Sequence, residues 1–440
     1  MSDTRQVTLE AVLAKGNMLC AWAQVERNGG AAGIDRKTIE ETGEHLKHHW
    51  AAIRQKLLAG QYRPAAVRAV EIPKASGGMR LLGIPTVQDR LIQQALHQVM
   101  SAAFDSQMSE HSYGFRPMRS AHEAVTAARG YVGQGKKWVV DIDLKSFFDQ
   151  VNHDRLMNML GTMIGDKRVL RLIGRYLRAP IRHASGRQEP RRRGTPQGGP
   201  LSPILANLYL DPLDKELERR GTAFVRYADD IAIFVSSERA AKRVLEGVKK
   251  WLHKQLDLEV NESKSGTGSS GDSQLLGFCI HESGEVSPSA KTIARLKERV
   301  RQLWDARQSL TSKELRDQWQ SYITGWWAYF RYANRRQDVQ ALSGWIRRHM
   351  RKCFWLRWHN RLGRRRALSR LGVKGRALGV AGCRRGAWAM AKHVVVNQAL
   401  KTATLARYGF ILPWELAEKK KSAGLNRRMR KTARPVVWEG

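Results

Sequence analysis

The stretch AFVRYADDIAIFV (223–235) consists of two apolar runs that meet at Asp229 and Asp230. These runs are rich in the β-branched and aromatic residues that favour strands, so the stretch predicts a hairpin with two adjacent acids at its turn. A second apolar run, WVVDID (138–143), also ends in an acid, Asp143. If the strands are neighbours in one sheet, the carboxylates of the three aspartates converge.

Adjacent carboxylates repel each other, and YADD alone is equally well explained as an ordinary turn. The distant Asp143 changes this interpretation, because clustered carboxylates suit Mg²⁺, which takes one or two of them together with phosphate oxygens. Two such ions activate a hydroxyl nucleophile and stabilise the leaving group of an in-line phosphoryl transfer. We therefore expect Asp143, Asp229 and Asp230 to be catalytic residues that hold two Mg²⁺ ions. Asp141, two residues before Asp143 on the same side of the strand, is a weaker candidate.

The rest of the chain supplies the elements around this sheet. Residues 1–60 show helical spacing of apolar residues, and an alternating run at 66–73 returns through 79–84 as a hairpin. Further elements are expected as helices over 87–104, 120–131, 153–164, 200–220 and 238–257 and as a strand over 275–280. The Gly/Ser-rich residues 266–273 predict a surface loop, and the chain looks helical from residue 288 onward. This order of elements predicts an α+β fold with an antiparallel sheet.

Positive charge dominates the composition and is concentrated near the C-terminus. The net charge is +37, and residues 291–440 contain 36 Lys and Arg against 8 Asp and Glu, together with ten of the 14 tryptophans. Basic residues interleaved with aromatic residues over such a length favour a nucleic-acid surface. A basic segment that lies on a membrane surface is the weaker alternative. No apolar run is long enough to span a bilayer, so no membrane partner is expected.

Several blocks of the sequence resemble the reverse transcriptases encoded within group II introns. YADDIAIFV (227–235) resembles their catalytic hairpin, and VVDIDLKSFFDQVNHDRL (139–156) resembles the block that carries their first catalytic aspartate. Further similar blocks lie at 33–38 (GIDRKT), 72–96, 112–125, 191–210 (RRRGTPQGGPLSPILANLYL) and 258–265 (LEVNESKS). The resemblance runs from Gly33 to Arg331. It implies a right-hand polymerase fold with fingers and palm, and RNA-directed synthesis of DNA from deoxynucleoside triphosphates.

The resemblance also implies which residues contact the nucleotide. The expected nucleotide-binding residues are Lys74, Arg80, Arg116, Phe148, Gln197 and Lys264. Lys74 and Arg80 would hold the triphosphate by charge-assisted hydrogen bonds. The ring of Phe148 would clash with a 2′-hydroxyl and select deoxynucleotides, with core packing as the alternative role. For Phe147, core packing is a good explanation.

Beyond the palm, residues 287–307 and 314–333 resemble the helical thumb, or X domain, of intron maturases. Residues 344–372 resemble the maturase region that holds intron RNA. The resemblance implies RNA-binding roles for basic residues of this region: Arg347, Arg348, Arg351, Lys352, Arg357, Arg364, Arg365 and Arg366. Trp355 and Phe354 are better explained as parts of a helical core. The implied partners are group II intron RNA and an RNA template with a DNA primer or target DNA.

Four regions are expected along the chain. They are an N-terminal helical extension of the fingers (1–60), the fingers and palm (61–285), the thumb or X domain (286–372) and a basic C-terminal maturase and DNA-binding region (373–440). The four cysteines form no CxxC pair, so neither a disulfide scaffold nor a zinc site is expected. Longer family members add a zinc-dependent nuclease domain with cysteine pairs. The sequence therefore resembles the bacterial class C proteins, which lack that domain.

The resemblance implies that the protein assists splicing of its intron and copies the intron RNA into DNA during retrohoming. This work would take place in the bacterial cytoplasm, and at the nucleoid during integration. Two other functions stay open. One is a splicing chaperone with an inactive palm, against which the intact Asp143, Asp229 and Asp230 argue. The other is a reverse transcriptase recruited to phage defence or spacer acquisition, against which the maturase-like region argues.

Overall fold

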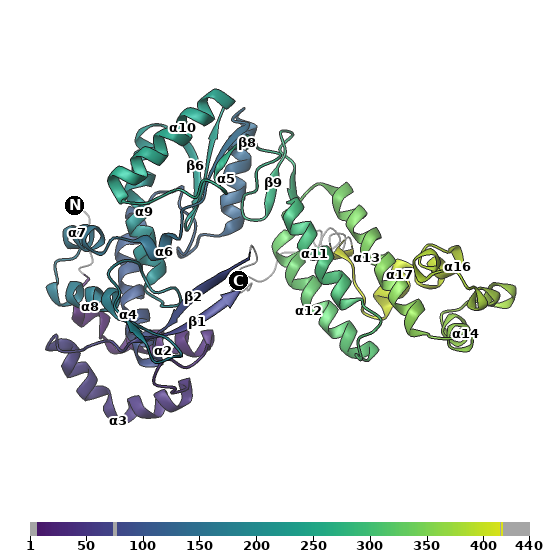
Figure 1. Ribbon diagram of the computed structural model, residues 1–440, viewed down its shortest axis with the longest axis horizontal. Coiled ribbons are helices and arrows are strands. Elements are labelled where there is room, and N and C mark those ends of the chain that lie inside the picture. Colours follow the sequence, from purple (N-terminus) through teal and green to yellow (C-terminus); the bar gives the residue numbers. More distant parts are fainter. Residues whose placement is uncertain (1–6, 74–76, 414, 417–440) are drawn as a thin grey trace, which may run out of the picture. The chain divides into compact units, whose positions relative to one another are not determined.

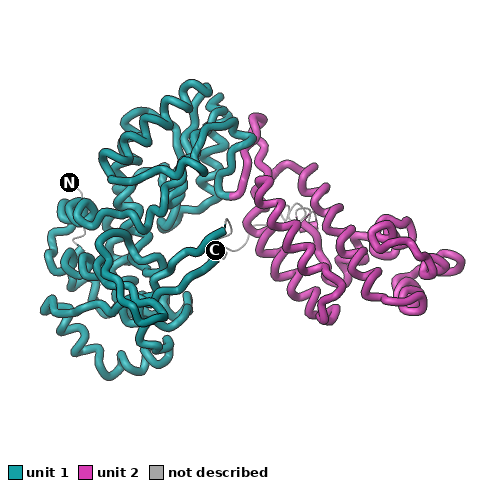
Figure 2. Tube along the Cα trace, in the orientation of Figure 1, with its two compact units in different colours: residues 1–276 teal, residues 277–440 magenta. Residues whose placement is uncertain are grey.

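The computed structural model describes residues 7–73, 77–413 and 415–416. The chain forms two compact units, residues 1–276 and 277–440 (Figure 2). Each unit has its own apolar core. Helices surround small sheets (Figure 1), which confirms the expected α+β class.

The first unit begins with the expected helices, which are α1 (Leu9–Val12), α2 (Lys15–Asn28) and α3 (Ile39–Leu58). The expected hairpin follows as the antiparallel strands β1 (Val67–Pro73) and β2 (Met79–Ile84). Two short strands, β4 (Ile181–Arg182) and β5 (Gln188–Glu189), extend it to a sheet of order β2-β1-β4-β5. Helix α4 (Val87–Phe104) packs against α1, α2 and α3. It is buried along most of its length, which ties the N-terminal helices to the rest of the unit.

A second, fully antiparallel sheet of order β6-β7-β3-β8 forms the centre of the same unit. Its strands are β3 (Trp138–Ile142), β6 (Ala223–Tyr227), β7 (Asp230–Val235) and β8 (Gly266–Ser269). Successive residues of β6 and β7 are buried, so both faces of these strands are covered. The covering helices are α5 (Ala121–Gly133), α9 (Ser202–Arg219) and α10 (Glu238–Trp251).

Strand β8 corrects the prediction of a surface loop over residues 266–273. Gly266–Ser269 pair with Asp141–Trp138 along the free edge of β3. The local composition was misleading, because Gly and Ser have low strand propensity and the pairing is decided by backbone groups of a distant strand. Helix α8 (Lys167–Arg178) and the strands β4 and β5 were not predicted either. The remaining described helices of this unit are η1 (Asp105–Gln107), α6 (Phe147–Gln150), α7 (His153–Met163) and η2 (Leu252–Leu256).

The second unit starts with a two-stranded sheet and is otherwise helical, as expected. Its elements are β9 (Phe278–Ile280), β10 (Val286–Pro288), α11 (Ala290–Leu303), α12 (Ser312–Phe330), α13 (Arg336–Arg357), α14 (Arg361–Arg370), η3 (Gly375–Gly382), α15 (Ala387–Met390), α16 (Val394–Ala399) and α17 (Thr402–Arg407). Trp319 and Trp355 are fully buried in its core, and Phe354 packs against that core. The core interpretation of Trp355 and Phe354 is thus confirmed.

The two units divide after Leu276, a few residues before the expected boundary at 285, because β9 and β10 pair within the second unit. The divisions at 60 and 372 stay predictions. Across the described residues, helices that combine the length and the apolar character of a membrane span are absent.

Candidate active site

The predicted aspartates lie at one end of the β6-β7-β3-β8 sheet. Ile142 pairs with Ile231, so Asp143 follows the end of β3 beside the start of β7 at Asp230. Tyr227 pairs with Asp230 across the tight turn that carries Asp229. Sheet register thus places residues that are more than 80 positions apart in the sequence at the same edge.

The electrostatics of these carboxylates show that they interact. Loss of hydration raises the pKa of Asp229, and the negative charge of Asp143 raises it further. For Asp230, loss of hydration and then the charges of Asp229, Asp143 and Asp141 raise the pKa to about 6. Burial also raises the pKa of Asp141 to about 6. A cluster of this kind concentrates negative charge that a cation would relieve.

The segment that follows η2 surrounds Asp143. Asn261 Nδ2 donates to Asp143 Oδ1 at 3.3 Å, and the Asp143 backbone N–H donates to Ser265 Oγ at 2.9 Å. Lys264 Nζ lies 3.6 Å from Asp143 Oδ2. The structure therefore places the predicted Lys264 beside the carboxylates. Asn261 and Ser265 were not singled out from the sequence, since short polar residues in a loop are common.

A buried ion pair supports the turn that carries Asp229. Arg226 and Asp214 are fully buried, and Arg226 Nε donates to Asp214 Oδ1 at 2.8 Å. Arg226 Nη1 also donates to Asn207 Oδ1 at 2.9 Å and to the Ala228 carbonyl at 3.0 Å. Ala228 has a positive φ of 59°, an uncommon conformation for a residue with a side chain. The guanidinium thus links α9 to the strained residue of the turn.

The sequence contained a signal for this network that was not used. Arg226 interrupts the apolar strand AFVRY, and Asp214 lies on the otherwise apolar face of the helix that begins at residue 202. Charged residues are almost never fully buried unless they are paired. Two opposite charges in two apolar segments therefore predict a buried pair.

The two phenylalanines before Asp149 have different surroundings. Phe147 is fully buried, which agrees with its expected core role. Phe148 is half-buried and meets Phe147 edge to face at a centroid distance of 5.3 Å. Part of its ring is thus accessible, and its role in sugar selection stays a prediction.

Gln197 and Arg80 lie together although they are far apart in the sequence. Arg80 Nε donates to Gln197 Oε1, and the Gly83 N–H donates to the Gln197 carbonyl at 3.0 Å. The positive charge of Arg80 also lowers the pKa of Asp229, against the larger effect of burial. Arg80 is thus within electrostatic reach of Asp229, and Gln197 is held beside Arg80. Lys74 lies outside the described residues.

Arg116 does not occupy the expected position at a ligand surface. Its side chain is buried and donates to Asp105 Oδ1 at 2.8 Å and to the Ser112 carbonyl at 3.0 Å. It also donates to the carbonyls of Ser109 and Asp105. Because its nitrogens are engaged within residues 105–116, the structure gives Arg116 the role of holding this loop. A template or nucleotide contact of Arg116 stays a prediction.

The predicted RNA-binding residues of the second unit fall into two groups. The first group is at least half-buried and holds the unit together by hydrogen bonds. Arg347 donates to Thr402, and Arg357 donates to the Leu310 carbonyl. Arg351 donates to Asn397 and to the Leu400 carbonyl. These bonds give them a structural role in the unit, and their expected contact with RNA stays a prediction.

The other group contacts aromatic rings or is exposed to solvent. The Arg364 guanidinium lies 4.5 Å from the centre of the Trp355 ring, and Lys352 Nζ lies 5.9 Å from the centre of the Trp388 ring. Arg365 and Arg366 are exposed, and Arg348 is partly exposed. Exposed Trp388, which was not predicted, adds an aromatic face beside Lys352.

The carboxylate edge of the sheet has the ligand chemistry that Mg²⁺ requires. In the described part of the chain, no group of three or more His, Cys, Asp or Glu side chains is arranged so that it could hold a metal ion. Mg²⁺ does not require one, because it keeps several waters and uses one or two carboxylates together with substrate phosphates. The carboxylates of Asp229 and Asp230, whose pKa values burial and neighbouring carboxylates raise, are oxygen ligands of the kind that such an ion uses.

Two family models match the chain in succession. Residues 72–280 match the model described as reverse transcriptase (RNA-dependent DNA polymerase). Residues 293–372 match the group II intron, maturase-specific domain. The first match contains the three aspartates, and the second contains α12, α13 and α14.

Curated relatives agree with both matches. YkfC of Escherichia coli (strain K12) is 29% identical over 59% of this chain and 77% of its own length. The group II intron-encoded protein LtrA of Lactococcus lactis subsp. cremoris is 30% identical over 55% of this chain and 51% of LtrA. The putative COX1/OXI3 intron 2 protein of Saccharomyces cerevisiae is 29% identical over 56% of this chain and 36% of that protein. The chain thus spans about half or less of the length of these intron-encoded relatives. The paired domains, the aspartates at the sheet edge and these relatives together show that the chain belongs to the group II intron-encoded reverse transcriptases, which are RNA-directed DNA polymerases with a maturase domain.

Proposed function

We propose that the chain copies its group II intron RNA into DNA with Asp143, Asp229 and Asp230 as the catalytic residues. The single observation that carries the proposal is the register of β3 and β7, which gathers these carboxylates at one edge. Deoxynucleoside triphosphates and an RNA template with a DNA primer or target DNA are the proposed substrates. The setting is the bacterial cytoplasm, and the nucleoid during integration.

The proposed mechanism assigns each step to residues of this chain. Asp143, Asp229 and Asp230 would hold two Mg²⁺ ions, which when bound activate the primer hydroxyl and neutralise charge on the leaving pyrophosphate. Arg80, Lys264 and the predicted Lys74 would orient the triphosphate by charge-assisted hydrogen bonds. Gln197, held by Arg80, would contact the nascent base pair. Arg226 keeps the turn with Asp229 in its productive conformation.

Removal of the metal tests this assignment directly. Primer extension on an RNA template should require Mg²⁺, stop on addition of a chelator and resume when excess Mg²⁺ is restored. Binding of the same primer–template should continue in the chelator, because it rests on basic side chains. Extension that persists after complete chelation would exclude the proposed metal role of the aspartates.

Phe148 is proposed to select the sugar. Phe148→Val should retain incorporation of deoxynucleotides and reduce discrimination against ribonucleotides by roughly 10–200-fold, the range for a steric contact in a pocket. The measurement is the ratio of the two kcat/KM values. Phe147→Val is the matched control, because the fully buried Phe147 should affect stability and leave that ratio unchanged. An unchanged ratio for Phe148→Val would leave Phe148 with core packing alone.

The second unit is proposed to bind intron RNA and assist splicing through exposed basic residues. Replacing Arg365 and Arg366 together by Ala, with or without Arg364, should weaken intron RNA binding and protein-assisted splicing at physiological salt. Each lost phosphate contact should lower the slope of log affinity against log salt by roughly 0.7–0.9. Extension of a short primer–template should change much less.

The matched control is Arg239→Ala with Arg243→Ala, which removes two exposed charges from α10 of the first unit. This control should leave intron binding nearly unchanged. Equal losses of splicing and of primer extension in the Arg365/Arg366 variant would assign the two residues to the primer–template duplex. No loss in either assay would indicate that Arg365 and Arg366 contribute only to solubility.

A further inference from the structure

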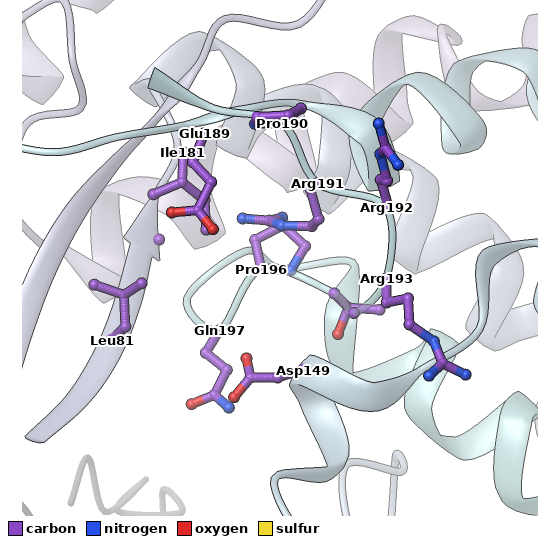
Figure 3. A pocket seen from close by; sticks show the side chains of 13 residues that line it. Leu81, Asp149, Ile181, Glu189, Pro190, Arg191, Arg192, Arg193, Pro196 and Gln197 are labelled. Carbon is purple, nitrogen blue, oxygen red and sulfur yellow. The ribbon is translucent and has the colours of Figure 1, made fainter. Parts of the chain in front are cut away.

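A pocket of about 220 Å³ lies between the sheet of the β1–β2 hairpin and the loop that precedes α9 (Figure 3). Leu81 and Ile181 line one side, and Asp149 and residues 189–197 line the rest. Pockets that enclose a drug-sized ligand measure roughly 300–1,000 Å³. This pocket is smaller, so it suits one polar group of a larger ligand.

Backbone contacts fix the loop that forms the pocket. The Gly194 N–H donates to the Val151 carbonyl at 2.8 Å, and the Thr195 N–H donates to the Phe148 carbonyl at 2.6 Å. Gly194 has a φ of +82°, and a Cβ there would lie 2.7 Å from the Phe148 carbonyl oxygen. The other end of the loop is held to β2 by the bond between Gly83 and Gln197. The pocket is therefore preformed, which reduces the entropy cost of binding.

Two polar atoms at this pocket are buried without a partner. Within the described part of the chain, Arg191 Nη1 and Thr195 Oγ1 have no hydrogen-bonded partner. Figure 3 shows Arg191 reaching into the pocket, whereas Arg193 extends away from it. Buried polar groups are nearly always paired, and an unpaired donor on a charged group is costly. Burial lowers the pKa of Arg191 to about 10, so its guanidinium still carries its charge at neutral pH.

The charges around the pocket favour an anion. Three arginines line it against the two carboxylates of Asp149 and Glu189. Glu189 lies 3.3 Å from His183, and Arg193 is paired with Asp257. Arg192 is exposed and has no hydrogen-bonded or ionic partner among the residues that the structure describes. Arg191, which interacts with the charge of Asp149, and the exposed Arg192 are thus the two arginines that supply positive charge to a ligand.

We propose that this pocket binds a phosphate group of the polymerase's substrate, with Arg191 and Thr195 as buried donors and Arg192 beside them. The inference rests on the proposed function, which brings both a template strand and a nucleoside triphosphate to Gln197 at the pocket wall. None of the proposed metal ligands lines the pocket, nor does Arg80 or Lys264. It is therefore a phosphate site in addition to the contacts assigned above.

Arg191→Met tests the proposal, because it keeps an unbranched apolar stem and removes the charged guanidinium. Binding is measured by fluorescence anisotropy, without nucleotide, for an RNA–DNA duplex that is blunt or carries a single-stranded RNA template extension. If the phosphate belongs to the template, Arg191→Met should weaken binding of the extended duplex about tenfold, the loss of one charge-assisted hydrogen bond. The salt slope should fall by about 0.7, and binding of the blunt duplex should stay unchanged.

If the phosphate instead belongs to the nucleoside triphosphate, Arg191→Met should raise the KM for the deoxynucleoside triphosphate about tenfold. Binding of both duplexes should then stay unchanged. Either result supports a phosphate pocket and identifies the source. Arg187→Gln is the matched control, because Arg187 is an exposed arginine of the nearby β4–β5 connection and lies outside the pocket. If neither quantity changes in folded Arg191→Met, the pocket holds only water and the proposal is overturned.

Two further variants separate binding from folding. Arg191→Lys should recover most of the affinity, because it restores a positive charge. Thr195→Val removes only the unpartnered hydroxyl, so it should fold as well as the wild type and bind the same ligand several-fold more weakly. If Arg191→Met does not fold, wild-type binding by Thr195→Val overturns the proposal. Duplex binding needs no catalysis, so the inference and the proposed polymerase activity fail separately.

Discussion

Asp229→Asn should reduce RNA-templated primer extension by roughly 100-fold or more, the scale of losing one preorganised electrostatic group in an active site. The substitution keeps the shape of the side chain and removes one negative charge from the set that would hold Mg²⁺. Because its surroundings raise the pKa of Asp229, its charge is less favourable in the folded protein than in the unfolded chain. Asp229→Asn should therefore fold at least as stably as the wild type.

The measurement combines primer extension with thermal unfolding and a splicing assay. Splicing assistance should survive in Asp229→Asn, because it depends on RNA binding and the intron RNA performs that chemistry. Asp154→Asn is the matched control, since Asp154 is an exposed acid at the start of α7, away from the carboxylate edge. Wild-type extension by folded Asp229→Asn would show that the catalytic assignment is wrong.

Asp214→Ala should destabilise the first unit by about 3–5 kcal/mol, the usual cost of removing one partner of a buried ion pair. The guanidinium of Arg226 would remain buried without its carboxylate partner. It would keep its hydrogen bonds to Asn207 Oδ1 and to the Ala228 carbonyl. Since Arg226 also holds the turn next to Asp229, the folded fraction should lose polymerase activity as well. Denaturant unfolding followed by a probe in the first unit measures the stability change.

Glu216→Gln is the matched control on the same helix. Glu216 is paired with Arg219 and Arg220 at the surface, where ion pairs contribute little. The Glu216→Gln protein should unfold at nearly the same denaturant concentration as the wild type. An Asp214→Ala protein with the wild-type midpoint would show that the buried pair does not hold α9 against β6.

The sequence by itself determined the elements that carry the proposed catalytic residues. Apolar strands that end in acid identified Asp143, Asp229 and Asp230, and helix and strand periodicity placed the hairpin of β1 and β2 and the helices α4, α9 and α10 close to their observed bounds. These features could be predicted because they depend on the local periodicity of apolar residues and on the order of the family-like segments along the chain. The same resemblance pointed to the reverse transcriptase and maturase regions that the family models match.

Tertiary structure alone decided which arginines are buried and how the edge of the central sheet is paired. Three arginines illustrate this. The side chains of Arg116 and Arg351 are buried and donate hydrogen bonds to backbone carbonyls, whereas Arg365 faces solvent. Gly266–Ser269 forms a strand because β3 offers unpaired backbone groups. The partners of a long side chain, and the strand that pairs with a weak strand-forming segment, are distant in the sequence. Local propensity therefore cannot predict them.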